Sequence, residues 1–173
     1  RGTYQRIKYP GGDIPREIGV CTDVIVRALR NAGFDLQKLI YLDMRRARRA
    51  YGLDAGRQPN RHIEHRRVRR QIVYFRRHYT SLPTAFATDS QGTDRWLPGD
   101  IVFLDTLPKR GPDHVGIVSD RTDSSGRPLI INNWDNGYQT GEMALLGSIP
   151  VTHRFRVTLP KRGRPTLRSL RRR

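Results

Sequence analysis

The sequence predicts an α+β fold, with helices in the first half of the chain and an antiparallel sheet in the second. Up to about Tyr79, apolar residues recur at the three- and four-residue spacing of amphipathic helices. After Trp96 they form short runs separated by Gly, Pro, Asp and Ser, as in strands and turns. A chain of 173 residues is long enough to bury a core without disulfides, and its single cysteine cannot form an internal one.

Three helices are expected before the sheet. The first begins at or near Cys21, has apolar side chains on most of its surface and ends at Gly33. The second covers residues 35 to about 50 and has an arginine-rich end. The third covers about 63–79, buries one apolar face and exposes many arginines. We therefore expect the first helix to lie deepest.

Four strands are expected after the helices. Their sequences are "LPGDIVFLD", "HVGIVSD", "PLIINNW" and "HRFRVTL". The segment "DRTDSSGRP" between the second and third runs has the composition of a turn, so it predicts a hairpin. The N-terminal helices are thus expected to pack on a C-terminal antiparallel sheet.

The charge of the chain is strongly positive, with a formal net charge of +17 and a pI of about 11.3. Residues 160–173 are rich in basic side chains and poor in apolar ones, so we expect a single domain over 1–159 and a disordered basic tail. A surface of this kind attracts polyanions, whether nucleic acid, anionic lipid or a cell-wall polymer.

Membrane insertion is not expected, because no run of 18 or more apolar residues occurs. The chain begins at Arg1 rather than Met, as expected of a processed or trimmed product, and shows no export signal. No exposed apolar stripe demands a partner, so a monomer is expected.

Cys21 is open to two interpretations. A cysteine near the start of a helix can be a small buried hydrophobe. It can also be a nucleophile, because a helix N-terminus lowers a thiol pKa when a cationic neighbour helps, and its N–H groups stabilise an oxyanion. The second interpretation needs a base.

Three of the five histidines lie on or next to the third helix, where solvated or capping roles are expected. They are His62, His65 and His78. The sequence "HIEH" lacks the spacing of a zinc-binding His-Glu-x-x-His motif, and we expect no metal site. His153 opens the last strand and reads as a surface residue.

His114 is the best candidate base, because it follows a Gly-Pro-Asp turn and opens the strand "HVGIVSD". A strand holds the imidazole rigidly, while the turn leaves one side open. A third group must orient the ring. Asn132 or Asn133 on the next strand has a suitable amide oxygen, and alternation lets only one of them face His114. Both asparagines also fit a polar strand end before the "DNG" turn.

Two sets of motifs carry a resemblance to known enzymes. "YPGGDIP…GVCTDVIVRAL" and "LPGDIVFL…DHVGIVSD" resemble the two halves of NlpC-type cell-wall peptidases, which are papain-like. More specifically, residues 9–155 resemble the bacterial family catalogued as domain of unknown function 1287. That family's pattern includes "GVCTDV", "HRRV", "PGDIV", "H-GIVSD" and an "HN" pair, and related pieces occur here in the same order.

The resemblance implies a papain-like (NlpC-type) fold, Cys21 as nucleophile, His114 as general base and Asn132 as the third member. Asn132 stands where the family has histidine, so Asn133 and a nearby carboxylate remain alternatives. Tyr9 is the counterpart of a tyrosine that supports the oxyanion in NlpC-type enzymes, one position closer to the glycines. No metal or organic cofactor is implied.

We therefore expect a cysteine amidase or endopeptidase acting on peptidoglycan peptides, periplasmic or secreted. It would serve in wall remodelling or as an antibacterial effector, and an effector would have a cognate inhibitor (immunity) protein. Its basic surface would bind an anionic polymer. Two alternatives are a non-catalytic nucleic-acid-binding protein, which the charge suggests, and a papain-like thiol acyltransferase, which keeps the fold and changes the reaction.

Overall fold

The chain folds into helices and one antiparallel sheet in the computed structural model, which describes residues 4–107, 111–134 and 139–158. This confirms the α+β class. The α-helices of the described residues are α1 (Cys21–Asn31), α2 (Leu36–Arg46) and α3 (Val68–His78). Short 3₁₀ turns are η1 (Arg48–Tyr51), η2 (Glu64–Arg66) and η3 (Gly92–Asp94). The strands are β1 (Thr80–Leu82), β2 (Ile101–Leu104), β3 (His114–Thr122), β4 (Pro128–Asn132), β5 (Gly141–Met143) and β6 (Val151–Arg156).

The sheet has the strand order β1-β6-β2-β3-β4-β5, and neighbouring strands are antiparallel. The hairpin expected between β3 and β4 is present, with Ile117 opposite Ile131. Strands β1 and β5 were not predicted. Each has three residues and lies at an edge of the sheet, and their exposed polar positions give no alternating pattern to detect.

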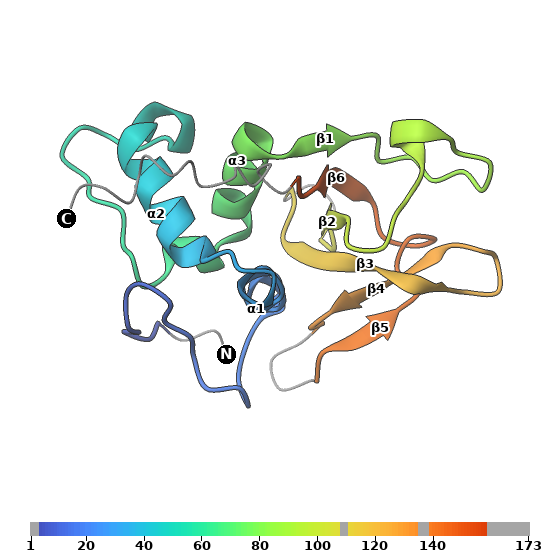
Figure 1. Ribbon diagram of the computed structural model, residues 1–173, viewed down its shortest axis with the longest axis horizontal. Coiled ribbons are helices and arrows are strands. Elements are labelled where there is room, and N and C mark those ends of the chain that lie inside the picture. Colours follow the sequence, from blue (N-terminus) through green and yellow to red (C-terminus); the bar gives the residue numbers. More distant parts are fainter. Residues whose placement is uncertain (1–3, 108–110, 135–138, 159–173) are drawn as a thin grey trace, which may run out of the picture.

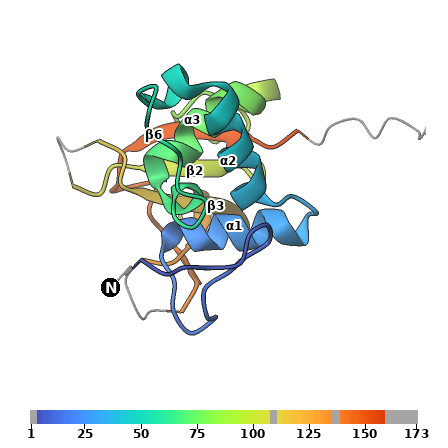
Figure 2. The same cartoon turned by 90° about the vertical axis from the view of Figure 1, so that its left-hand side faces the viewer.

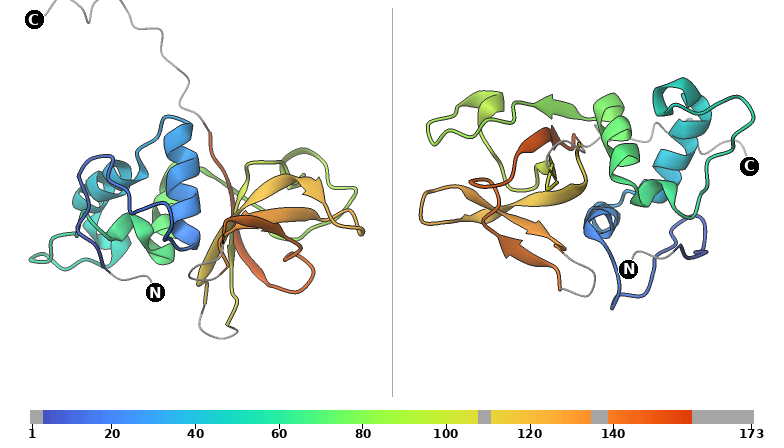
Figure 3. Two further views of the ribbon diagram at one scale, coloured as in Figure 1. Left: turned by 90° about the horizontal axis from the view of Figure 1, so that it is seen from below. Right: turned by 180° about the vertical axis from the view of Figure 1, so that it is seen from behind.

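The helices gather on one side of the molecule and the sheet on the other (Figures 1 and 2). Helix α1 is the one nearest the sheet, and it lies against β3 (Figure 3). The main core joins buried side chains of all three helices to strand residues such as Phe103, Val115 and Phe155. A smaller core around Trp96 and Val102 packs apolar residues of β2, β3 and β4 against flanking loops.

Two helices are shorter than their apolar patterns suggest. The second ends at Arg46 because Ala47 leaves the helical conformation, with φ −116° and ψ 47°, and a 3₁₀ turn follows. The third begins only at Val68, because Arg67 is extended with φ −106° and ψ 122°. The residues before it form the separate turn η2, which lies against α1 and α2.

Gly116 lets β3 and β4 come close together. A Cβ at this position would lie 2.3 Å from the Ile130 side chain and 2.9 Å from the Ile131 carbonyl oxygen. Only glycine avoids those contacts. It therefore helps to hold the first residue of β3 beside the last residue of β4, and both are candidate site residues.

Two further predictions concern the C-terminal tail and membrane-spanning helices. The tail expected to be disordered, 160–173, lies outside the described residues. Among the residues that the structure does describe, none of the helices has the length and apolar character needed to cross a membrane.

Candidate active site at the junction of helix and sheet

Helix α1 begins at Cys21, and its first turn is held in place from within the helical layer. The Asp23 carboxylate accepts a hydrogen bond from the Val20 N–H at 2.7 Å. The same carboxylate receives the Arg66 guanidinium through two bonds of 2.6 and 2.9 Å. The side chains of this ion pair are 3% and 5% exposed, so Arg66 is enclosed together with its counter-charge.

Thr22 and Gln71 complete this arrangement, and we call Thr22, Asp23, Arg66 and Gln71 the α1 anchor. The Thr22 hydroxyl donates to the Arg66 carbonyl at 2.9 Å. Gln71 donates to the carbonyls of Thr22 and His65 at 3.3 and 2.9 Å. The anchor fixes where α1 starts and therefore where the Cys21 side chain projects.

His114, the first residue of β3, is 7% exposed and is oriented by Asn132. Its Nε2 lies 3.1 Å from the Asn132 Oδ1. The Asn132 amide nitrogen donates to the Ile130 carbonyl at 2.9 Å, which leaves Oδ1 as the atom facing the ring. Because Oδ1 can only accept, Nε2 carries the proton and Nδ1 is the free basic nitrogen.

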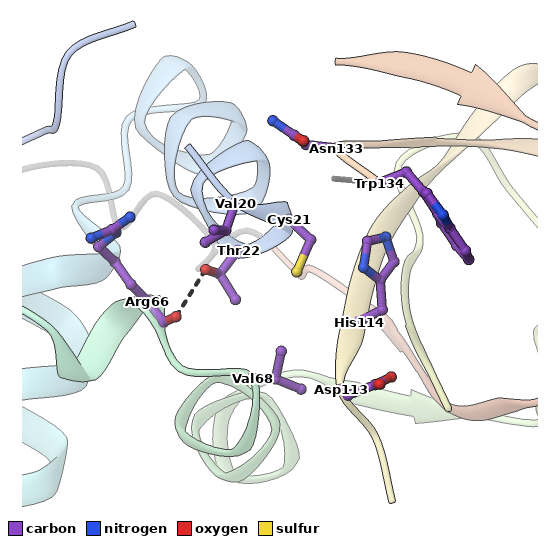
Figure 4. Close-up of a pocket in the computed structure, with 9 residues that line it drawn as sticks. All are labelled: Val20, Cys21, Thr22, Arg66, Val68, Asp113, His114, Asn133 and Trp134. Atoms are coloured by element: carbon purple, nitrogen blue, oxygen red, sulfur yellow. Dashed lines mark hydrogen bonds between the residues drawn. The ribbon is translucent and has the colours of Figure 1, made fainter. Parts of the chain in front are cut away.

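The sulfur of Cys21 and the imidazole of His114 face each other across one cavity (Figure 4). The cavity has a volume of about 300 Å³ and opens to solvent. It lies where the first turn of α1 meets the start of β3. Its lining, which we call the pocket, consists of Val20, Cys21, Thr22, Arg66, Val68, Asp113, His114, Asn133 and Trp134. The structure thus brings Cys21 and His114 together.

The thiol of Cys21 is not activated in the way that its helix position suggested. Burial raises its pKa to about 11, and the carboxylates of Asp23 and Asp113 act in the same direction. Hydrogen bonds from the N–H groups of Val115 and Thr22 oppose this effect and are outweighed. The expected lowering required a cationic neighbour, and His114, which faces the sulfur, has a lowered pKa instead.

The imidazole of His114 also favours its neutral form. Burial lowers its pKa, while the hydrogen bond to Asn132 and the charge of Asp113 partly offset the effect. The resting site therefore holds a neutral thiol opposite a neutral imidazole near pH 7. A thiolate–imidazolium ion pair is therefore not the resting form of these two side chains.

Asn133 lies in the pocket but does not orient His114. Asn132 makes that hydrogen bond, so the two asparagines have different positions although they are adjacent. Trp134, which the sequence reasoning missed, has its ring centroid 5.0 Å from that of His114. The only signal for it was its position directly after the "NN" pair.

Tyr9 does not line the pocket, so its expected place beside the oxyanion is wrong. Its ring packs edge-on against Tyr41 at 5.1 Å, beneath the Arg61 guanidinium at 5.6 Å. The reason lies in the glycine turn that follows. The Gly12 N–H donates to the Gln37 side chain at 2.9 Å, so the turn is held at the start of α2 and keeps Tyr9 there.

The other histidines lie outside the pocket. His65 is buried, not solvated, and burial with the nearby charge of Arg66 lowers its pKa to about 4. His78 faces Asp43, and His153 contacts Arg76. In the part of the chain that the structure describes, no three His, Cys, Asp or Glu side chains are grouped so as to hold a metal ion.

Comparison with known proteins places the chain in a family. It matches the family described as domain of unknown function DUF1287 over residues 1–157. The chain belongs to the DUF1287 family. The DUF1287 chain is also 40% identical over 139 residues to a protein of Escherichia coli (strain K12) named "Uncharacterized protein YijF".

The aligned residues make up 79% of the DUF1287 chain and 63% of YijF, so the chain spans about three fifths of this curated relative. No solved structure matches the chain. The site is therefore interpreted from its own geometry.

Proposed function

We propose that this DUF1287 chain is a papain-like (NlpC-type) thiol hydrolase that cleaves amide bonds in peptidoglycan peptides. The observation that carries the proposal is the His114–Asn132 hydrogen bond beside the Cys21 sulfur in an open cavity (Figure 4). A nucleophile, a base that faces it and a group that orients the base are the components of a thiol hydrolase. A nucleophile on a helix opposite a base on an antiparallel strand further supports the papain-like architecture.

The first half of the reaction makes an acyl-enzyme. The S–H proton of Cys21 passes to Nδ1 of His114 as the sulfur bonds to the substrate carbonyl carbon, giving a tetrahedral oxyanion. The imidazolium then returns that proton to the amide nitrogen, the C–N bond breaks and the amine leaves. Asn132 keeps Nε2 protonated throughout, so Nδ1 always faces the reacting atoms.

The second half releases the acid. Water gives a proton to Nδ1 of His114 and bonds to the thioester carbon. The S–C bond then breaks and the thiolate takes the proton back, which restores the neutral pair. The raised pKa of Cys21 favours the return of the proton, because the buried thiolate is a strong base.

The oxyanion would form beside the first turn of α1. The Val20 N–H is already bonded to Asp23, and the Thr22 N–H is directed at the sulfur. The backbone N–H of Cys21 has no hydrogen bond within the described residues. That N–H is the donor we assign to the oxyanion.

The test compares the native chain with Cys21→Ala on purified peptidoglycan fragments, followed by mass spectrometry. We expect new amine and acid termini with the native chain and none with the variant. Equal cleavage by both would end the proposal. Adding an external amine distinguishes a hydrolase from an acyltransferase, because a transferase would yield products that carry that amine in place of water.

The basic surface supports a second contact with an anionic polymer. Residues 45–77 contain twelve arginines and only two carboxylates, Asp54 and Glu64. An anionic envelope polymer would be attracted to this segment and would hold the enzyme near its substrate. Binding of the chain to sacculi, measured by co-sedimentation, should weaken as the salt concentration rises. Tight, salt-sensitive binding to duplex DNA with no cleavage of peptidoglycan would favour the nucleic-acid-binding alternative.

The proposed substrate places the enzyme in the periplasm or outside the cell. Wall remodelling and attack on a competitor's wall use the same chemistry. An enzyme of the second kind requires an inhibitor protein in the producing cell. Expression directed to the periplasm should cause lysis that depends on Cys21, whereas expression in the cytoplasm should not.

A further inference from the structure

The Asn133 side chain contains a polar atom that the fold leaves without a partner. Its Oδ1 is buried, and among the described residues no donor lies within hydrogen-bond distance of it. Its neighbour Asn132 differs, because both ends of that amide are bonded. Buried acceptors are rarely unsatisfied in folded proteins, and those that are call for an explanation such as a ligand.

Asn133 stands between two cavities. One is the pocket that contains Cys21 and His114. The other has a volume of about 470 Å³ and lies beside the loop that precedes α1. In Figure 4 the Asn133 amide is turned away from His114, so it does not compete with Asn132 for the ring.

The second cavity has a polar lining. It is formed by Arg16, Glu17, Ile18, Gly19, Arg27, Asn133, Gln139 and Thr140. Arg27 is held by Asp13 at 3.0 Å and serves as a fixed wall. Arg16 and Glu17 are exposed, and no ion pair within the described residues occupies either one. The charged side chains Arg16 and Glu17 in this lining suit a polar residue of a ligand.

A primary amide is the natural partner of a peptide group. Its oxygen accepts from a backbone N–H, and its NH₂ donates to a backbone carbonyl. Because the Asn133 Oδ1 has no partner among the described residues, it is left to accept a hydrogen bond from a ligand. An extended peptide that reaches Asn133 from the sulfur would continue into the second cavity.

We propose that Asn133 binds a backbone peptide group of the substrate, and that the second cavity holds the next, polar residue of the same peptide. The inference rests on the proposed function and adds that the substrate peptide must have a minimum length. The substrate must extend at least one residue beyond the attacked bond on the Asn133 side. Asn133 is a specificity-determining residue here, and Asn132 remains the residue that positions His114.

The test measures binding in a Cys21→Ala background, so that the peptide stays intact. Isothermal titration would use soluble tetrapeptides released from peptidoglycan and the dipeptides derived from them. We expect Asn133→Ala to weaken tetrapeptide binding about tenfold, as for the loss of one or two hydrogen bonds, and to change dipeptide binding less than twofold. Asn31→Ala, at the exposed end of α1, is the matched control and should change neither.

Thermal unfolding distinguishes this role from a structural one. An unsatisfied buried acceptor does not stabilise the free protein through that atom, so Asn133→Ala should not lower the melting temperature by more than about 2 °C. Asn133→Asp, which keeps the size of the side chain, provides a second variant.

Equal tetrapeptide affinities with and without Asn133, or no tetrapeptide binding at all, would overturn the inference. Failure of the proposed function looks different. In that case the native chain cleaves nothing, while the Cys21→Ala protein still binds the tetrapeptide in a manner that depends on Asn133.

Discussion

Two polar clusters meet at the first turn of α1, and they differ in how completely their groups are satisfied. In the α1 anchor, each charge has its counter-charge and Asp23 also accepts the Val20 N–H, although the Gln71 Oε1 has no partner among the described residues. In the pocket, a thiol faces an imidazole with a free nitrogen, and the oxygen of Asn133 has no partner among the described residues. A cluster whose charges are paired fixes a structure, whereas a cluster that lines an open cavity is available to a ligand.

The two buried histidines show the same contrast. His65 lies on the anchor side and is 2% exposed, while His114 lies in the pocket and is 7% exposed. Burial lowers both pKa values. Only His114 has an orienting partner on one ring nitrogen and a cavity on its other side. Burial alone therefore does not identify a candidate base, and the open side does.

Removal of His114 should give the largest change in activity. His114→Ala takes away the imidazole that faces the sulfur, so cleavage should fall by about two to four orders of magnitude. The rate would be measured on the fragments that the native chain cleaves. His78→Ala, whose side chain faces Asp43 instead, should keep the native rate. Equal losses of cleavage rate in His114→Ala and His78→Ala would show that the pocket is not the site of the reaction.

Breaking the anchor should change stability rather than chemistry. Asp23→Asn leaves the buried guanidinium of Arg66 without a counter-charge, and the expected loss is about 3–5 kcal/mol of unfolding free energy. Urea denaturation would measure it. The rate per folded molecule should change less than tenfold. An unchanged stability would show that the anchor does not fix α1.

His65, which is next to Arg66 of the α1 anchor in the sequence, should make the free energy of unfolding depend on pH. Its pKa is about 4 in the folded chain, below the usual 6.5, so the unfolded chain binds the proton more tightly. This difference in the pKa of His65 contributes to the free energy of unfolding. The contribution is complete above pH 6.5 and is lost as the pH falls toward 4. Between pH 7 and 4.5 the loss is about 2–3 kcal/mol.

A comparison with His65→Phe isolates that contribution. The variant should lose about 2–3 kcal/mol less than the native chain over the same interval, because phenylalanine does not titrate. Denaturant unfolding at both pH values would measure the difference. Identical pH dependence in the two proteins would mean that His65 takes up its proton while folded.

The smallest effect is expected at Asn132. Asn132→Ala leaves His114 in place but frees the ring to rotate and to change tautomer. The loss of this hydrogen bond should lower the cleavage rate about tenfold. Asn132→His should restore part of the rate, since an imidazole can accept the same N–H. If Asn132→Ala were as inactive as His114→Ala, Asn132 would take part in the chemistry directly.

The sequence predicted three helices followed by β2, β3, β4 and β6, and it also singled out Cys21 and His114, because those signals are local. The choice between Asn132 and Asn133 needed the resemblance, since both fit the same strand end. Tyr9 was misplaced because the glycine turn contacts α2 across 25 residues, from Gly12 to Gln37, and no local pattern encodes this. The pKa of Cys21 was misjudged for a similar reason, because burial of the thiol arises from packing across the fold and outweighs the N–H groups of Val115 and Thr22.

The sulfur and the imidazole belong to opposite layers of the fold, and 93 residues of chain separate Cys21 from His114. During synthesis the thiol emerges long before its base. Until β3 has joined the sheet and met α1, the cysteine has no imidazole opposite it, and under the proposed function the growing chain cannot attack an amide. Under the proposed function, a chain that ends before His114 would therefore be inactive, and reactivity would require the helix and the sheet to have docked.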